Sequence, residues 1–210
     1  MVYLQFAELY SEIDAPILMN SWESAELIKH TANAFLAMKL TFVNEIATLC
    51  EITGADIRDV TSGIGYDPRI GSEYMQAGPG WGGSCFPKDS ASLAQVARSF
   101  GFDFTLLEHT IDLNRKHLDR TAHKVSQLIP NNTSTRKVAA WGLTFKAGTD
   151  DMRESSSNII IPYLSKKNAQ IRYYEPTGYK NNFKKLKNVK FFDKIKDACN
   201  LSDLIIIHTD

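Results

Sequence analysis

Apolar residues follow different patterns in the first and second parts of the chain. Over residues 20–129 they recur at three- and four-residue intervals, the spacing of amphipathic helices. The longest run begins with Asn20 and Glu23, spaced as an N-cap and its N3 partner, and ends at Gly54. It predicts a single helix of roughly thirty residues, about 45 Å long.

Three shorter helices are predicted in the same region. The first covers residues 55–62. The second starts at Pro87, a favourable first helical residue, and ends at Phe100 because Gly101 follows. The third, with a long polar face, covers residues 106–128.

After the polar stretch 131–136, strands and helices alternate. We predict strands at 137–143, 171–174, 189–192 and 204–208, and helices at 155–166 and 194–200. Alternation of this kind indicates parallel βαβ units and a Rossmann-like sheet. The predicted fold class is therefore α + α/β: a helical domain followed by a partial Rossmann-like parallel α/β domain.

The ends of the chain suggest a longer parent protein. The chain stops at Asp210, directly after its most hydrophobic strand, whereas a doubly wound sheet normally continues with further units. Residues 1–19 resemble the tail of a preceding domain. We therefore expect truncation at both ends and divide the chain into residues 1–19, 20–131 and 132–210.

Composition and charge exclude several classes of protein. Hydrophobic residues make up 43% and charged residues 23%, as in an ordinary globular protein. Lys+Arg and Asp+Glu are 24 each, without the basic excess that nucleic-acid binding requires. No apolar run is long enough for a membrane span, and no signal peptide is recognisable. Three widely spaced cysteines suit a reducing cytoplasm and form neither a disulfide framework nor a metal site.

Residues 78–89, Gly-Pro-Gly-Trp-Gly-Gly-Ser-Cys-Phe-Pro-Lys-Asp, form the most informative stretch. They contain G-x-G-x-x-G at Gly78, Gly80 and Gly83, but no strand precedes it and a proline interrupts it, which argues against a dinucleotide fingerprint. We expect the glycines to let the backbone approach a ligand closely and to present Cys85 at a helix start.

Cys85 is the candidate nucleophile. The helix start favours a thiolate, Lys88 adds positive charge, and Asp89 offers a carboxylate within reach. The alternative is a small buried filler, which is the interpretation we adopt for Cys50 and Cys199 because both lie in apolar helical patterns.

Two further candidates lie on or near the long helix. Lys29 and Asn33 are four residues apart and share a face, and a buried Asn33 would need a hydrogen-bonding partner. The pattern fits a solvated surface Lys29 equally well. Arg69 could anchor a phosphate or hydroxyl group, although the pattern alone favours an ordinary turn arginine.

A third cluster, residues 141–157, follows a strand and opens a helix, where α/β sheets bind ligands. Lys146 and Arg153 could hold phosphates there, and Ser155 could cap the helix. No histidine is placed as an obvious base. We expect four of them to be surface groups: His30, His109, His117 and His123.

Together these clusters resemble the UDP-glucose/GDP-mannose dehydrogenase family. The resemblance extends through residues 25–35, 44–46, 67–71, 82–89 and 145–157, and the cysteine motif is highly specific. It implies oxidation of a sugar C6 alcohol to a carboxylate in two NAD-dependent hydride transfers. The Cys-Phe-Pro-Lys-Asp sequence is closer to the UDP-glucose branch than to the GDP-mannose branch.

The resemblance assigns a role to each candidate. Cys85 would form a thiohemiacetal and then a thioester, Lys29 and Asn33 would stabilise the oxyanion, and Asp89 would help to activate water. The UDP-sugar site would include Tyr74, Gly82 and Lys146, with Arg69 reaching it across a homodimer formed by the long helices. The cofactor-binding residues would be Lys88 and Arg153.

The family's N-terminal NAD-binding domain is represented at most by residues 1–19. We therefore expect residues 20–131 to be the central dimerisation domain and 132–210 part of the UDP-sugar-binding domain, and we expect no turnover by this chain alone. GDP-mannose or a UDP-N-acetyl-hexosamine stays open as the substrate. So does a non-catalytic dimerisation and nucleotide-binding module.

Overall fold

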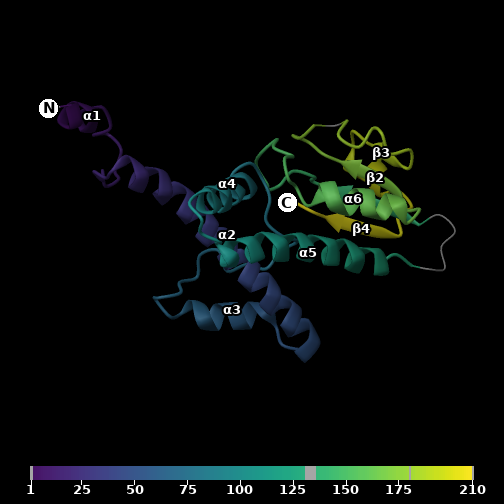
Figure 1. Cartoon of the computed structure of the whole chain (residues 1–210). Coiled ribbons are helices and arrows are strands. Elements are labelled where there is room, and N and C mark those ends of the chain that lie inside the picture. The colour runs from purple at the N-terminus through teal and green to yellow at the C-terminus, as the bar shows by residue number, and fades with distance from the viewer. Residues whose placement is uncertain (1, 131–135, 180, 210) are drawn as a thin grey trace.

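The computed structural model describes residues 2–130, 136–179 and 181–209, and within them helices precede a small sheet (Figure 1). The helical part consists of α1 (Val2–Leu9), α2 (Trp22–Thr53), α3 (Ile57–Gly65), α4 (Phe86–Ser99) and α5 (Thr105–Gln127). The α/β part consists of β1 (Lys137–Trp141), α6 (Ser157–Lys166), β2 (Gln170–Tyr174), β3 (Val189–Phe191), α7 (Ile195–Cys199) and β4 (Leu204–Ile207). The predicted fold class is confirmed.

Helix α2 is the long axis of the helical part (Figure 1). It begins one residue later than predicted, because Ser21 rather than Asn20 is the N-cap: the Ser21 hydroxyl accepts a hydrogen bond from Ser24 N. It ends where predicted, at Gly54, which takes the left-handed conformation with φ 80°. Helices α4 and α5 pack against α2, and α1 stands beyond its N-terminal end (Figure 1).

Helix α4 differs from the prediction at its first turn. It starts at Phe86, so Pro87 lies inside the first turn and Cys85 is itself the N-cap residue. Helix α3 is displaced by two to three residues, because the side chain of Asp56 caps it at Arg58 N. Both changes are local, and the predicted order of helices is unaffected.

The four strands form one parallel sheet in the order β3-β2-β1-β4. Val138 in β1 lies in register with Ile171 of β2 and Leu204 of β4. The chain passes from β1 through β2 to β3 on one side of β1 and then returns to β4 on the other side. The gap between the carboxyl ends of β1 and β4 is therefore the switch point where such sheets bind ligands. The loop after β1, residues 142–156, lies at that edge.

The α/β part has a continuous hydrophobic core. Its members include Val138, Ile161, Leu164 and Ile171, each at most 1% exposed. Strand β1 ends at Trp141, two residues before its predicted end, because Leu143 N donates to the Glu175 carboxylate instead of continuing the ladder. Helix α6 starts two residues late because the Ser155 hydroxyl donates to Leu143 O.

Within the described residues, no helix has the length and apolar character needed to cross a bilayer.

Candidate functional site

The glycine-rich loop that carries Cys85, residues 78–85, is called the cysteine loop below, and a buried tryptophan holds it in place. Trp81 donates from its indole Nε1 to Thr41 Oγ1 of α2 at 2.8 Å, and its backbone exchanges two hydrogen bonds of 2.9 Å with the Asn114 side chain of α5. These contacts fix the loop between α2 and α5. Cys85 follows four residues later, exposed at the start of α4.

Two glycines of this loop, Gly82 and Gly83, pack closely against the loop after β1. A Cβ on Gly82 would collide with the backbone oxygen of Glu154, and one on Gly83 would lie 2.7 Å from the Phe145 ring. Gly83 N also donates to Arg153 O at 3.1 Å. Gly82 and Gly83 therefore bring the cysteine loop into contact with the loop after β1, whereas a Cβ on Gly78 would meet nothing within 4 Å.

Asp89 is the centre of the polar cluster beside Cys85. Its side chain is fully buried, and Oδ2 accepts hydrogen bonds from Lys29 Nζ and Asn33 Nδ2, both at 2.6 Å. Lys88 Nζ lies 3.2 Å from Oδ1. The structure therefore brings Lys29 and Asn33 of α2 to Asp89, which lies one helical turn after Cys85 and donates from its backbone N to Cys85 O.

The electrostatics of this cluster favour an ionised carboxylate. The hydrogen bond from Lys29 holds the pKa of Asp89 far below its usual range, although burial acts in the opposite direction. The pKa of Lys29 is raised, chiefly by its hydrogen bond to Asp89 and to a smaller extent by the Cys85 sulfur. Lys29 therefore combines an exposed side chain with an ion pair to a buried carboxylate.

Two histidines expected at the surface contact the site region instead. His30 Nδ1 is buried and lies 3.7 Å from Asp89 Oδ1. His117 Nε2 lies 2.8 Å from Gly78 O and so bonds to the glycine-rich loop. The sequence pattern placed both on helices but could not show which face of each helix meets the loop.

A groove of about 900 Å³ lies between the glycine-rich loop and the loop after β1. Tyr74 and Lys146, predicted to bind the same ligand, both line it, together with Gly78, Gly80 and Trp81. Tyr74 has a positive φ of 59°, rare for a tyrosine, which turns this segment at the groove. Gly82, predicted in the same set, packs against Glu154 outside this lining.

The predicted phosphate-binding cations differ in their surroundings. Arg153 is 73% exposed, and its pKa is raised, mainly by the hydrogen bond to Asp151 and to a lesser extent by Cys85. Lys88 is 68% exposed. Arg69 is 87% exposed and bonds only Asp67 of its own turn among the described residues. Within one chain, Arg69 therefore stands apart from the groove.

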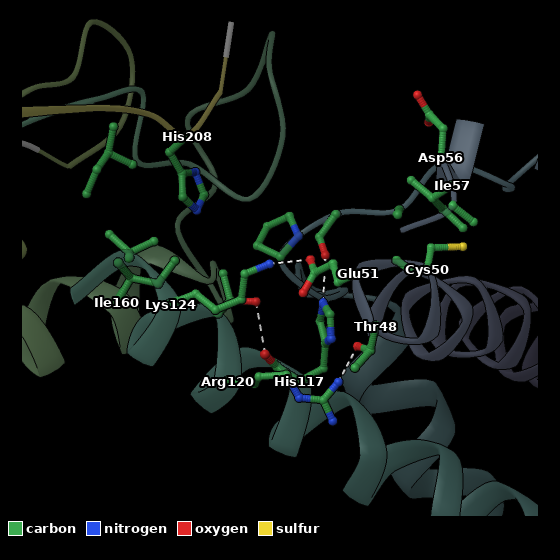
Figure 2. Close-up of a pocket in the computed structure, with 18 of the residues that line it drawn as sticks. Thr48, Cys50, Glu51, Asp56, Ile57, His117, Arg120, Lys124, Ile160 and His208 are labelled. Atoms are coloured by element: carbon green, nitrogen blue, oxygen red, sulfur yellow. Dashed lines mark hydrogen bonds and ion pairs between the residues drawn. The ribbon is translucent and has the colours of Figure 1, made fainter. Parts of the chain in front are cut away.

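A second cavity, of about 650 Å³, lies between α2, α5, α6 and β4 (Figure 2). Most charged groups on its wall are already paired: Lys124 with Glu51, and Arg120 with Thr48 and Glu45. His208 at its edge bonds Ser156, and burial lowers the pKa of His208. The sequence pattern does not predict this cavity, because its lining comes from five segments: 47–57, 77–79, 117–125, 160 and 206–208.

Other residues that shape the site were also missed. Asn44 Oδ1 accepts from Gly78 N at 2.9 Å, and Asn114 holds Trp81. The sequence could have indicated both asparagines, because an asparagine on a buried helix face needs a hydrogen-bonding partner. Among the described residues, no group of three His, Cys, Asp or Glu side chains could hold a metal ion.

Comparison with known proteins gives consistent matches. Residues 23–116 match the UDP-glucose/GDP-mannose dehydrogenase family, central domain, and residues 139–210 match its UDP binding domain. The chain is 39% identical over 201 residues to UDP-glucose 6-dehydrogenase of Rickettsia prowazekii, covering 95% of this chain and 46% of that protein. It is 41% identical to UDP-glucose 6-dehydrogenase YwqF of Bacillus subtilis, over 97% and 46% of the two chains.

Solved structures show the same likeness. A UDP-glucose dehydrogenase from Pyrobaculum islandicum superposes with a TM-score of 0.85 at 30% identity, over 99% of this chain and 48% of that one. GDP-mannose dehydrogenase from Pseudomonas aeruginosa gives a TM-score of 0.57 at 28% identity. The chain spans about half the length of the relatives it matches.

Proposed function

Because this chain belongs to the UDP-glucose/GDP-mannose dehydrogenase family, we propose that it supplies the catalytic thiol and the nucleotide-binding α/β part of a UDP-glucose 6-dehydrogenase. The observation that carries the proposal is the convergence on Asp89: Lys29 and Asn33 of α2 both bond its buried carboxylate, one helical turn after the exposed Cys85 at the start of α4. A binding module would not require such an arrangement around an exposed cysteine.

The chemistry proposed for Cys85 is covalent. The sulfur adds to the C6 aldehyde carbon to give a thiohemiacetal, and loss of a hydride from that carbon leaves a thioester. Water then attacks the thioester carbon, which releases the carboxylate and returns the thiol. NAD, when bound, accepts the hydride in each of the two oxidations.

Lys29 and Asn33 suit the stabilisation of the oxyanion. The ammonium group has three N–H donors and the amide has two, and each spends only one on Asp89 Oδ2. Each therefore retains a donor for a substrate oxygen, held in place by the buried carboxylate. Asp89 with a strongly lowered pKa is a weak proton acceptor, so we assign it mainly to the orientation of these donors.

The groove with Tyr74 and Lys146 is the proposed site of the UDP group. Lys146 Nζ lies 5.4 Å from the Phe145 ring centroid and offers a positive charge to a phosphate. Lys88 and Arg153 fit the phosphates of NAD, because both are largely exposed cations beside the cysteine loop.

We also propose a homodimer through α2. Four apolar side chains spaced by seven residues form a half-exposed stripe along this helix: Ile28, Phe35, Phe42 and Leu49. Lys39, on the same helix, donates to Ile70 O at 2.8 Å and so holds the turn that carries Arg69 against α2. A partner chain along α2 would therefore lie within reach of Arg69.

The test joins this chain to the part of the R. prowazekii enzyme that it does not match, and follows NADH formation with UDP-glucose. The expected yield is two NADH for each sugar, lost when Cys85→Ser is introduced. Turnover only with GDP-mannose or a UDP-N-acetyl-hexosamine would reassign the substrate. A folded chimera that is silent with all of them, while this chain still binds UDP, would favour the non-catalytic module.

A further inference from the structure

The acidic residue after β2 faces inward. In dinucleotide-binding α/β folds, an acidic residue of the first βαβ unit hydrogen-bonds the ribose of the ligand. Glu175, directly after β2, is only 1% exposed. Its carboxylate is taken up by the protein's own backbone: Oε1 accepts from Thr177 N and Gly178 N, both at 2.9 Å, and Oε2 accepts from Leu143 N.

These bonds connect the loop after β2 to the loop after β1. Leu143 lies near the start of the loop that follows β1. Its carbonyl accepts hydrogen bonds from the hydroxyls of Ser155 and Ser157 at the far end of the same loop. Thr177 Oγ1 reaches Thr149 O at 2.8 Å in the loop's middle. Glu175 and its neighbours therefore hold the beginning and the middle of residues 143–152.

The same loop carries the groups proposed to meet the substrate. Lys146 lines the groove, and the oxygen of Arg153 accepts from Gly83 N of the cysteine loop. Gly178 allows close packing here, since a Cβ at this position would lie 3.0 Å from both Met152 Sδ and Thr144 Cγ2. A change at Glu175 would therefore alter the loop that carries Lys146.

We propose that Glu175 is a positioning residue for nucleotide binding: its carboxylate fixes the 143–152 loop so that Lys146 faces the groove, and it makes no bond to the nucleotide. This inference rests on the proposed function, because it takes the groove to be the site of the UDP group.

The carboxylate must be ionised for this role. Burial raises the pKa of Glu175, but the hydrogen bonds from Gly178, Thr177 and Leu143 outweigh burial, so the net pKa is lowered. An ionised carboxylate only accepts hydrogen bonds, which matches three converging N–H groups. The amide of Glu175→Gln would direct an NH₂ group at one or more of these donors and leave them without an acceptor.

The experiment measures UDP binding by calorimetry for the natural chain, Glu175→Gln, Lys146→Ala and the double variant. Each single change is expected to weaken UDP binding by about tenfold or more, as loss of a supporting contact commonly does. The double variant should bind no more weakly than Lys146→Ala, because Glu175 acts through Lys146. Asp193→Asn, an exposed acid of the same part of the chain, is the matched control and should leave binding unchanged.

Hydrogen exchange separates this inference from the proposed function. In Glu175→Gln the amides of residues 143–152 should exchange faster than in the natural chain, while those of β1 and β2 keep their protection. Glu175→Asp retains the charge, so its loop exchange should lie between that of the natural chain and that of Glu175→Gln. Additive losses of UDP affinity, unchanged affinity in Glu175→Gln, or unchanged exchange in the loop would each overturn the positioning role. If the natural chain binds no UDP, the proposed function is contradicted. The exchange result would then still show whether Glu175 fixes residues 143–152.

Discussion

The helical and α/β parts bury their apolar residues to very different extents. The α/β part has a core in which Val138, Ala139, Ala140 and Leu164 are fully buried. On α2, by contrast, Phe35 and Phe42 are more than half exposed. The core of the α/β part is closed by its own elements together with Ala122 of α5 and Ile129 just after it, whereas α2 presents an apolar surface that the proposed second chain would cover.

The two parts also differ in charge. Residues 1–135 contain 10 Lys+Arg and 16 Asp+Glu, whereas residues 136–210 contain 14 and 8. The net charge of zero is therefore the sum of an acidic helical part and a basic α/β part. The cysteine loop lies where the two meet, so the proposed anionic nucleotide would be attracted to the basic α/β side while the proposed nucleophile, Cys85, comes from the helical side.

The largest expected effect is the loss of the α/β core. Leu164→Ala, at a side chain that is 0% exposed, should lower the free energy of unfolding by about 2–5 kcal/mol because it leaves a cavity. Leu128→Ala, at a leucine 65% exposed, is the control and should change it by less than about 0.5 kcal/mol. Urea titration followed by circular dichroism gives both values. Equal losses would contradict the conclusion that Leu164 lies in a closely packed core.

The next effect concerns the apolar stripe of α2. Phe42→Glu places a charge in the surface proposed for dimerisation and should weaken self-association about 100-fold, as loss of a central aromatic contact can. Tyr179→Glu makes the same kind of change at an aromatic residue 66% exposed in the α/β part, and should have no effect. Sedimentation equilibrium measures both, and a natural chain that is monomeric at all concentrations would refute the stripe as an interface.

A smaller effect is expected at Asp89 and should depend on pH. Its lowered folded-state pKa means that the carboxylate stabilises the fold above the unfolded value of 3.8 and loses this contribution as pH falls below it. Asp89→Asn should therefore cost on the order of 1–3 kcal/mol near neutrality and progressively less in acid. Lys29 is 63% exposed, so solvent screens its share of the ion pair.

Urea titrations from neutral pH down into acid give the Asp89→Asn profile. The exposed Asp103→Asn is the control, with a difference near zero throughout. A constant penalty for Asp89→Asn across this range would mean that the carboxylate's charge is not what stabilises the cluster.

The order of elements and the fold class were predictable from sequence, because periodicity and Gly or Pro stops act locally. The residues around Cys85 were also identified, but not their common centre: Lys29 and Asn33 are roughly sixty positions before Asp89, and only packing of α2 on α4 joins them. The inward-facing Glu175 and the cavity beside His208 escaped for the same reason. Contacts between distant segments leave no periodic signal.

The predicted start of α2 was wrong because two neighbouring residues can each cap the helix. This helix start also gives the smallest testable effect. Asn20 and Ser21 are both good caps, and only the backbone decides between them: Ser21 is extended at φ −62°, ψ 159° and accepts from Ser24 N at 3.2 Å. Ser21→Ala should cost about 1 kcal/mol, felt mainly as faster hydrogen exchange in the first turn. Asn20→Ala should change nothing. Because this turn lies at the exposed end of α2, far from the α/β core, exchange in β1 should be identical in both variants. A rise in β1 exchange would show that the start of α2 unfolds together with the sheet, although no part of that first turn packs in the α/β core.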